Sequence, residues 1–188
     1  MACPVANSGA TIVTITADNI FNSQGQIQGQ KVQLAATNIN NMGGSISGGD
    51  VTISAGNVVA LSTVETGTDS QTSGRGYNTR STENFNVGSS VSSGGKISVT
   101  SGADTIIHGS TVDAKSTIDI KAGGNVAITA ATDTSTMYSH NSGGGGGFSG
   151  GKKSTTIDLK QQDNLASRIR SGESISPRGS WRNAGRDH

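Results

Sequence analysis

Apolar residues recur every nineteen residues in the first third of the chain. The pattern that repeats combines alternating apolar and polar positions, which predicts β-strands with one buried face. Clusters of glycine and asparagine between these stretches, such as residues 40–44, predict tight turns. The recurring sets are Val13, Val32 and Val51; Ile15, Leu34 and Ile53; Ala17, Ala36 and Ala55; Asn19, Asn38 and Asn57; and Ile20, Ile39 and Val58.

A nineteen-residue unit of short strands is too small to enclose a core alone, so copies of it must stack on one another. The repeat therefore predicts an all-β fold, a β-helix (β-solenoid) of parallel strands about 4.8 Å apart. Each set of like residues becomes a column inside the stack. The asparagine set predicts a ladder of side-chain amides that bond from coil to coil.

Two further coils have a longer spacing. Ile97 and Val99 recur twenty-one residues later as Ile118 and Ile120. Relative to the nineteen-residue coils, each of these coils has one extra residue before its first strand. A second extra residue lies just before Asp104, and with both counted Asp104 aligns with Asn125. We expect coils over residues 11–61 and 96–130, after a lead-in over residues 1–10.

Two long polar insertions interrupt the coils at one position. Leu61 and Ile128 each lie ten residues after the first inward residue of their coil, and a polar segment follows each. We place these insertions at residues 62–95 and 131–155. Alternating Thr/Ser arms around glycine predict extended hairpins. Insertions on one face of a solenoid often form its binding face, and a flexible loop without a partner is the alternative.

The carboxyl-terminal region, residues 156–188, reads as a degenerate basic tail that re-enters a coil at 169–176. Ile169 and Ile175 lie seventy-eight residues after their counterparts in an earlier coil. The next inward position is Pro177. Because proline is excluded from central strands, we expect the coil pattern to end there.

Charge is unevenly distributed along the chain. Residues 1–151 carry six Lys/Arg against nine Asp/Glu, and residues 152–188 carry eight against four. Trp181 is the one stacking aromatic beside the arginines of the tail, so we favour a solvated tail and expect no nucleic-acid partner.

Neither the cysteine content nor the amino-terminal residues indicate a special environment. Cys3 is the only cysteine, which excludes an intrachain disulfide framework and a thiolate metal site. The first residues lack the charged and apolar regions of a signal peptide, and no apolar run approaches the roughly 20 residues needed to span a bilayer. We expect no membrane insertion, and we expect the chain to be part of a longer protein.

The strands Gly49–Asn57 and Lys121–Val126, with the spacers Gly43–Gly48 and Ser110–Ala114, resemble the haemagglutinin repeats of filamentous-haemagglutinin-type exoproteins. The resemblance covers about residues 11–160. It implies a right-handed β-helix, secreted to the bacterial cell surface through an outer-membrane transporter (two-partner secretion). It also implies a role in adhesion or in contact-dependent growth inhibition, with a protein receptor or glycan on other cells as partner.

No catalytic, cofactor-binding or metal-binding residue is predicted. The segment Gly146–Lys152 has the spacing of a phosphate-binding loop, but Lys153 follows where Ser or Thr is required. The three histidines, His108, His140 and His188, have no second ligand at metal spacing.

A carbohydrate-active β-helix enzyme is the alternative from a different class. It would need two carboxylates on adjacent coils at one position. Asp50 aligns with Lys31 and Asp104 aligns with Asn125, so this requirement is not met. We therefore predict a non-enzymatic segment that is a structural stalk or a binding module, with a truncated structural fragment as the remaining alternative. Uncapped coils also predict end-to-end self-association.

Overall fold

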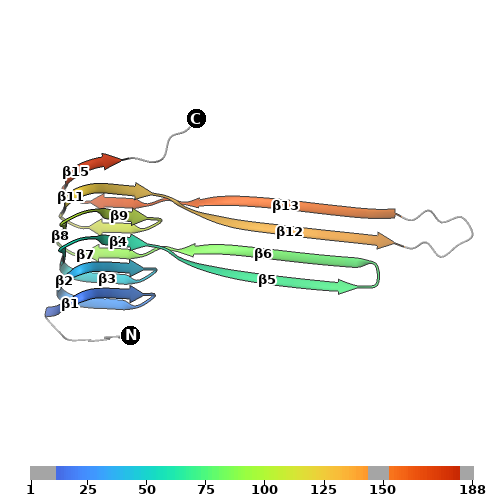
Figure 1. Cartoon of the computed structure of the whole chain (residues 1–188), viewed down its shortest axis with the longest axis horizontal. Coiled ribbons are helices and arrows are strands. Elements are labelled where there is room, and N and C mark those ends of the chain that lie inside the picture. The colour runs from blue at the N-terminus through green and yellow to red at the C-terminus, as the bar shows by residue number, and fades with distance from the viewer. Residues whose placement is uncertain (1–11, 144–152, 183–188) are drawn as a thin grey trace, which may run out of the picture. The chain divides into compact units, whose positions relative to one another are not determined.

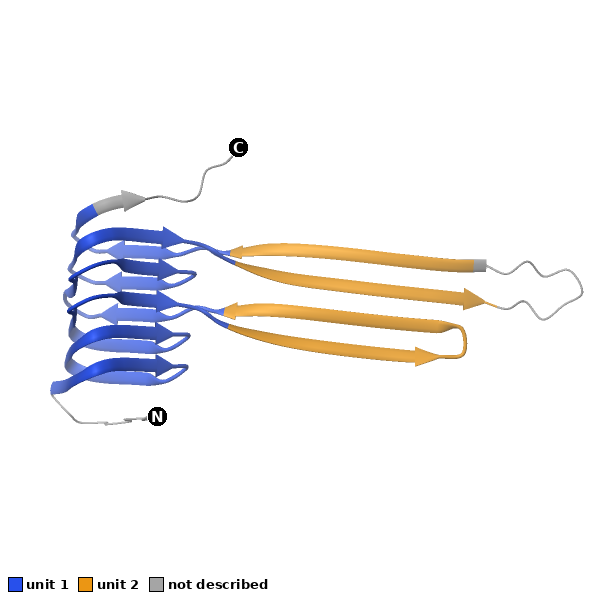
Figure 2. Cartoon of the chain, in the orientation of Figure 1, with its two compact units in different colours: residues 1–64, 87–131, 165–188 blue, residues 65–86, 132–164 orange. Residues whose placement is uncertain are grey.

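The computed structural model describes residues 12–143 and 153–182 (Figure 1). Within these residues every regular element is a β-strand, which confirms the all-β prediction. The chain forms two compact units, coloured separately in Figure 2. Unit 1 comprises residues 1–64, 87–131 and 165–188, and unit 2 comprises residues 65–86 and 132–164.

Unit 1 is a parallel sheet in which strands far apart in the sequence pair side by side. Its strands are β1 (Ile12–Ser23), β2 (Gln26–Met42), β3 (Ser45–Ala55), β4 (Val59–Ser62), β7 (Ser90–Ser93), β8 (Ile97–Ser101), β9 (Thr105–His108), β10 (Thr111–Ala114), β11 (Thr117–Thr129), β14 (Arg168–Ser171) and β15 (Ser174–Arg182).

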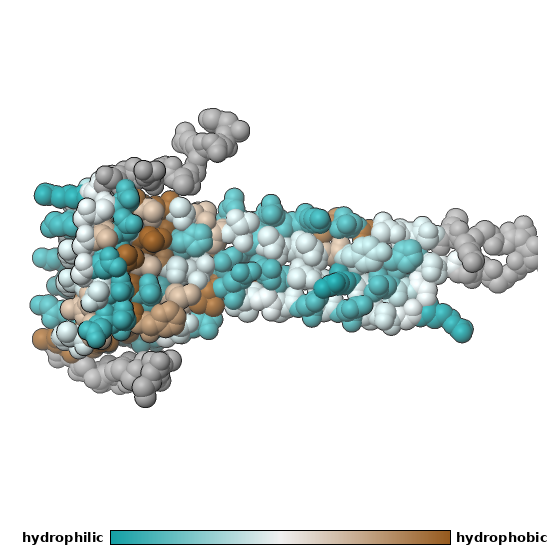
Figure 3. All heavy atoms as spheres, viewed as in Figure 1, coloured by the Kyte–Doolittle hydropathy of each residue, from teal (hydrophilic) through white to brown (hydrophobic). Residues whose placement is uncertain are grey.

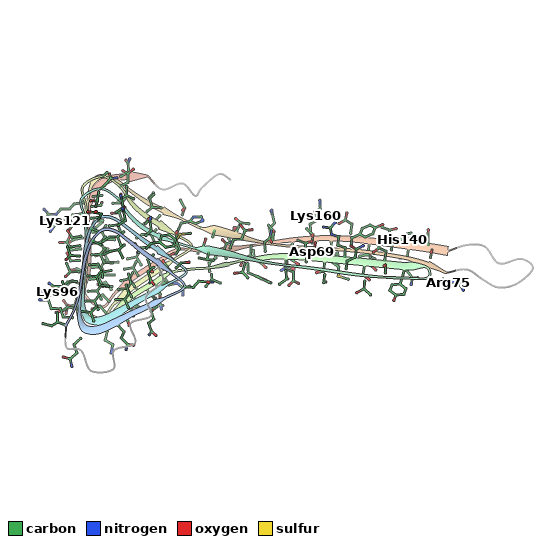
Figure 4. The ribbon with its side chains drawn as sticks, turned by 60° about the horizontal axis from the view of Figure 1, so that its bottom comes forward. Asp69, Arg75, Lys96, Lys121, His140 and Lys160 are labelled. Atoms are coloured by element: carbon green, nitrogen blue, oxygen red, sulfur yellow. The ribbon has the colours of Figure 1, made fainter. Side chains whose placement is uncertain are left out.

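Each coil of unit 1 passes through three sides in turn. The second coil runs along the first side at residues 31–36, along the second at 39–42, and along the third at 45–48. The coils of unit 1 have a roughly triangular outline in Figure 4. Long strands such as β2 turn a corner without losing their pairing, which is why one strand contributes to more than one side.

The observed register confirms the predicted repeat. Val32 pairs with Val13 on one neighbour and with Val51 on the other, nineteen residues away in each direction. Ile97 pairs with Ile118, twenty-one residues away. The asparagine ladder is also present, because Asn38 donates to Asn19 at 2.9 Å and accepts from Asn57 at 3.0 Å.

The inward residues form one continuous core along the stack. The largest fully buried side chains are the aliphatic residues of these columns. Burial of apolar surface in this core is the main stabilising term for a chain with only 31% hydrophobic residues. Members of the core include Val32, Leu34, Ile39, Ile46, Val51, Ile53, Val59, Leu61, Val91, Ile97, Val99, Ile107, Val112, Ile118, Ile120 and Val126.

One predicted column was wrong by one residue. The sequence places Val58 after Ile20 and Ile39, but Ile39 pairs with Val59, which is fully buried. The third coil has gained a residue at the corner that follows Asn57. The asparagine keeps its place in the ladder, so the added residue shifts only the positions after it.

The prediction that the coil pattern ends at Pro177 was also wrong. Strand β15 pairs with β11 from Ser174 to Arg182, and Pro177 lies opposite Ile120. Among the described strands β15 pairs with β11 alone, so it is an edge strand, where proline is tolerated.

The direction of the backbone N–H groups explains why Pro177 fits. Val51 donates its N–H to Lys96 of the next coil at 3.0 Å, and Ile53, two residues further, points its N–H the same way. Pro177 continues the column of Ile53 through Val99 and Ile120. Its nitrogen therefore points away from β11, and the missing donor removes no bond from the stack.

Unit 2 is a four-stranded antiparallel sheet in the order β13-β12-β6-β5. Its strands are β5 (Val64–Gly74), β6 (Tyr77–Val87), β12 (Ala131–Gly143) and β13 (Lys153–Leu165).

The units divide the chain at positions other than the expected insertion boundaries. Residues 90–93 lie in β7 of unit 1 and not in the first insertion, because the segment keeps one inward apolar residue, Val91. The second insertion extends past residue 155 to residue 164, since β13 is the return arm of its hairpin.

Candidate binding surface

The two insertions leave unit 1 from the same position in their coils, as the sequence predicts. Leu61 pairs with Ile107, and Ile107 pairs with Ile128, so the three residues form one column. In the intervening coil the chain crosses this position in a tight turn at Gly109, whose φ of 53° suits glycine.

The arms of the two insertions join into one sheet. Strand β6 of the first insertion pairs with β12 of the second over eight residue pairs, from Asn84 opposite Thr134 to Tyr77 opposite Asn141. The sequence predicts an extended hairpin for each insertion but not the pairing of one hairpin with the other. No periodic apolar pattern marks the pairing, because most residues of both strands are polar.

The sheet of unit 2 has two faces of different character, because side chains alternate between faces along each strand. We call them the polar face and the apolar face. Residues that lie opposite each other on β6 and β12 share a face. Met137 therefore shares a face with Ser81, and Tyr138 shares the other face with Arg80. Hydrogen bonds from Thr82 to Asp69 and between His140 and Thr156 assign the residues of β5 and β13. The polar face comprises Gly67, Asp69, Gln71, Asn78, Arg80, Thr82, Asn84, Thr134, Thr136, Tyr138, His140, Thr156, Asp158, Lys160 and Gln162. The apolar face comprises Thr66, Thr68, Ser70, Thr72, Tyr77, Thr79, Ser81, Glu83, Phe85, Asp133, Ser135, Met137, Ser139, Asn141, Thr155, Ile157, Leu159, Gln161 and Asp163.

Side chains on the polar face bond to one another across strands. Asp69 accepts from Arg80 at 3.2 Å and from Thr82 at 3.3 Å. The imidazole of His140 lies 3.0 Å from the Thr156 hydroxyl. Figure 4 labels Asp69, His140 and Lys160 on this sheet. The exposed ring of Tyr138 lies opposite Arg80, so this face offers an aromatic ring beside charged hydrogen-bonding groups.

The apolar face carries five of the six large apolar or aromatic side chains that are exposed among the described residues of unit 2. These are Tyr77, Phe85, Met137, Ile157 and Leu159, which are 42–57% exposed, whereas Tyr138 alone lies on the polar face. Figure 3 shows apolar residues among the mostly hydrophilic ones of unit 2. Exposed apolar side chains gathered on one face mark an interaction surface.

The Thr/Ser arms identified in the sequence lie on opposite faces. Thr66, Thr68 and Ser70 belong to the apolar face, whereas Thr132, Thr134 and Thr136 alternate onto the polar face. The two arms are therefore not equivalent surfaces.

The residues considered for chemistry do not converge in the described part of the chain. His108 contacts Thr129 of the neighbouring coil at 2.8 Å, and His140 lies in unit 2. Across residues 12–143 and 153–182, no group of three His, Cys, Asp or Glu side chains could hold a metal ion. His188 and the glycine-rich segment up to Lys152 lie outside the described residues.

The carboxylates of unit 1 bond within the stack. Asp104 accepts from the backbone N–H of Asn125 at 2.7 Å, as their alignment predicts, and Asp50 accepts from the backbone N–H of Lys96 at 3.0 Å. Asp119 forms an ion pair with Lys121 at 2.8 Å on the outer surface. Each of these three carboxylates meets a donor from the same or a neighbouring coil.

Comparison with known proteins identifies part of the chain. Residues 62–144 match the profile of a family described as hemagglutinin repeat, which confirms the resemblance over that stretch. The match spans the first insertion, the coil between the insertions, and strand β12. No curated protein and no solved structure shows significant similarity to the chain. Among the described residues there is no helix, and hence none of the length and hydrophobicity that a membrane-spanning helix requires.

Proposed function

We propose that the chain is a non-enzymatic segment of a secreted, cell-surface exoprotein of the filamentous haemagglutinin type. In this proposal unit 1 is a right-handed β-helix that serves as a stalk. Unit 2 is the surface that contacts a protein receptor or glycan on another cell, in adhesion or in a contact-dependent interaction. The parent protein reaches the bacterial surface through its outer-membrane transporter.

The observation that carries this proposal is the joint between β6 and β12. Two insertions separated by a coil contribute their arms to one sheet, with eight residue pairs between them. Unit 1 pairs its strands with no contribution from this sheet. The sheet also concentrates exposed tyrosines, other apolar side chains and charged groups, as recognition surfaces do.

The coil between the two insertions has no insertion of its own, so it shows how a variant without unit 2 can be designed. In the intervening coil, a single residue, Gly109, separates His108 from Ser110. Ser62 and Ser89 occupy the corresponding positions in the coil before it, and Thr129 and Ser167 occupy them in the coil after it. Replacing residues 63–88 and residues 130–166 by one glycine each gives a coil-only variant.

Attachment of beads coated with the full chain or with the coil-only variant to a panel of bacterial and animal cells tests the proposal. We expect the full chain to attach to at least one cell type and the coil-only variant to lose that attachment while keeping its β-sheet circular dichroism. Attachment by a folded coil-only variant would assign the contact to unit 1. If the full chain attached to none of the cells, the adhesive function would be wrong and a structural spacer would be favoured.

A further inference from the structure

The apolar face of unit 2 is arranged in rows that run across the four strands. Two observations fix the register of β5 against β6, namely the bond from Thr82 to Asp69 and the two-residue turn at Arg75–Gly76. In this register Ser70 lies opposite Ser81. The bonds Thr132–Asn164 and His140–Thr156 fix β12 against β13, in which Met137 lies opposite Leu159.

Large and small side chains are segregated within these rows. One row contains Ser70, Ser81, Met137 and Leu159, and the next contains Thr72, Thr79, Ser139 and Ile157. In both rows the large apolar residues lie on β12 or β13, and β5 and β6 contribute only Ser or Thr. In these two rows one half of the face is raised and the other half is flat, whereas in the flanking rows the large side chains, Tyr77 and Phe85, lie on β6.

We infer that this face pairs with the same face of a second copy of the chain. A two-fold axis parallel to the strands, midway between β6 and β12, places β13 of one copy over β5 of the other. Leu159 then covers Ser70 of the second copy, and Met137 covers Ser81. In these two rows every large side chain meets Ser or Thr of the second copy, so the two sheets close there to the usual spacing of about 10 Å.

The charges of the apolar face fit this pairing. Glu83 lies in the row of Ser135, and the two-fold axis sets these two positions over each other. Asp163 is set over Thr66 in the same way, and Asp133, which accepts from the backbone N–H of Asn86 at 2.7 Å, is set over Phe85. None of the three carboxylates faces another one. The polar faces of both copies, with the Asp69–Arg80 ion pair, remain exposed on the outside. An interface related by a two-fold axis needs one self-complementary patch, which these rows provide.

This inference goes beyond the proposed function, since it names a second copy as a partner whether or not unit 2 also contacts other cells. It also differs from end-to-end association of the coils, which involves the strand edges of unit 1.

Chemical cross-linking between two single-cysteine variants tests the pairing. With Cys3→Ser as background, the Ser70→Cys and Leu159→Cys variants are mixed and treated with a short bismaleimide. Within one copy these positions lie on the outer strands of the sheet, roughly 14 Å apart at about 4.8 Å per strand. Because each variant has one thiol, every cross-link joins two copies. The matched control is a mixture of Gln71→Cys and Lys160→Cys, on the same strands but on the polar face.

We expect the Ser70→Cys and Leu159→Cys mixture to cross-link roughly tenfold faster than the control, because pairing raises the effective thiol concentration toward the millimolar range. Adding Met137→Asp to both variants should abolish this excess, whereas adding Thr136→Asp should not. Equal rates in the test and control mixtures would overturn the inference. Faster cross-linking of Leu159→Cys with itself than with Ser70→Cys would also overturn it, since that indicates a different two-fold arrangement.

Discussion

At the scale of single residues, Asn22 and Asn41 form an asparagine pair separate from the ladder of Asn19, Asn38 and Asn57, and Asn41 lies in the core. Asn41 is fully buried, accepts from the side-chain amide of Asn22 at 2.7 Å, and donates to the carbonyl of Gly44 at 3.0 Å. In the next coil Leu61 occupies the same column. An amide is tolerated in the core at Asn41 because both of its polar atoms are bonded. Its oxygen accepts from Asn22, and its nitrogen donates to the Gly44 carbonyl, which also accepts from the backbone N–H of Ser90 at 2.9 Å.

Replacing Asn41 with alanine should lower the free energy of unfolding by about 1–3 kcal/mol, because the Gly44 carbonyl and the Asn22 amide each lose a partner. The neighbouring Asn40 points outward, and Asn40→Ala should change stability by less than about 0.5 kcal/mol. Urea unfolding followed by circular dichroism measures both. Equal effects would contradict a specific role of the buried amide.

At the scale of elements, stability depends on how many neighbours a coil has. Ile53 has coils on both sides and is fully buried, whereas Ile15 in the first described coil is only half-buried. Stacked repeats gain much of their stability from interfaces with their neighbours.

We therefore expect Ile53→Ala to cost about 2–5 kcal/mol, the range for buried isoleucine, and Ile15→Ala to cost clearly less. Hydrogen exchange resolved by residue is the appropriate measurement, because it reports the local stability of each coil. The stacked-coil account would fail if the two substitutions destabilised the same coils to the same extent.

The sequence predicted the strands of unit 1 well because each buried column repeats an apolar residue at a fixed interval. Val13, Val32 and Val51 carry that information, and their register is as predicted. The joint between β6 and β12 could not be predicted in this way. Its pairs, such as Thr136 with Thr82, are mostly polar and lie fifty or more residues apart, so nothing local in either strand specifies the other.

Pro177 illustrates a different limit. Its effect depends on the direction of one backbone nitrogen, which follows from the pairing of β15 with β11 and not from the residue itself. A proline that would break a central strand is compatible with an edge strand whose nitrogen points outward.

At the scale of the whole molecule, the described coils end in two strand edges of different kinds. Strand β1 pairs only with β2, and its twelve residues contain no proline. Strand β15 carries Pro177, which removes one donor from its outer edge. Exposed edges pair with other chains, and proline reduces this tendency. We propose that end-to-end association occurs between these edges and that Pro177 weakens it.

Replacing Pro177 with valine restores an outward N–H and should strengthen concentration-dependent association. Sedimentation velocity over a range of concentrations would detect the change. Ser176→Val is the matched control, because the N–H of the adjacent residue points toward β11. An unchanged distribution for Pro177→Val, or an equal shift in the control, would contradict the proposed edge pairing.

Two insertions separated by a coil form one sheet, and an engineered disulfide between β6 and β12 would detect this pairing in solution. Thr82 and Thr136 lie opposite each other on the polar face, and side chains so placed have Cβ atoms about 4.5–5.5 Å apart, close enough for a disulfide after a small adjustment. In a Cys3→Ser background, Thr82→Cys with Thr136→Cys should form an intrachain disulfide under mild oxidation. Thr82→Cys with Ser135→Cys should not, because residue 135 lies on the other face. Selective bond formation in the first pair is the predicted result. Failure of that pair, or equal oxidation of both, would contradict the joined sheet.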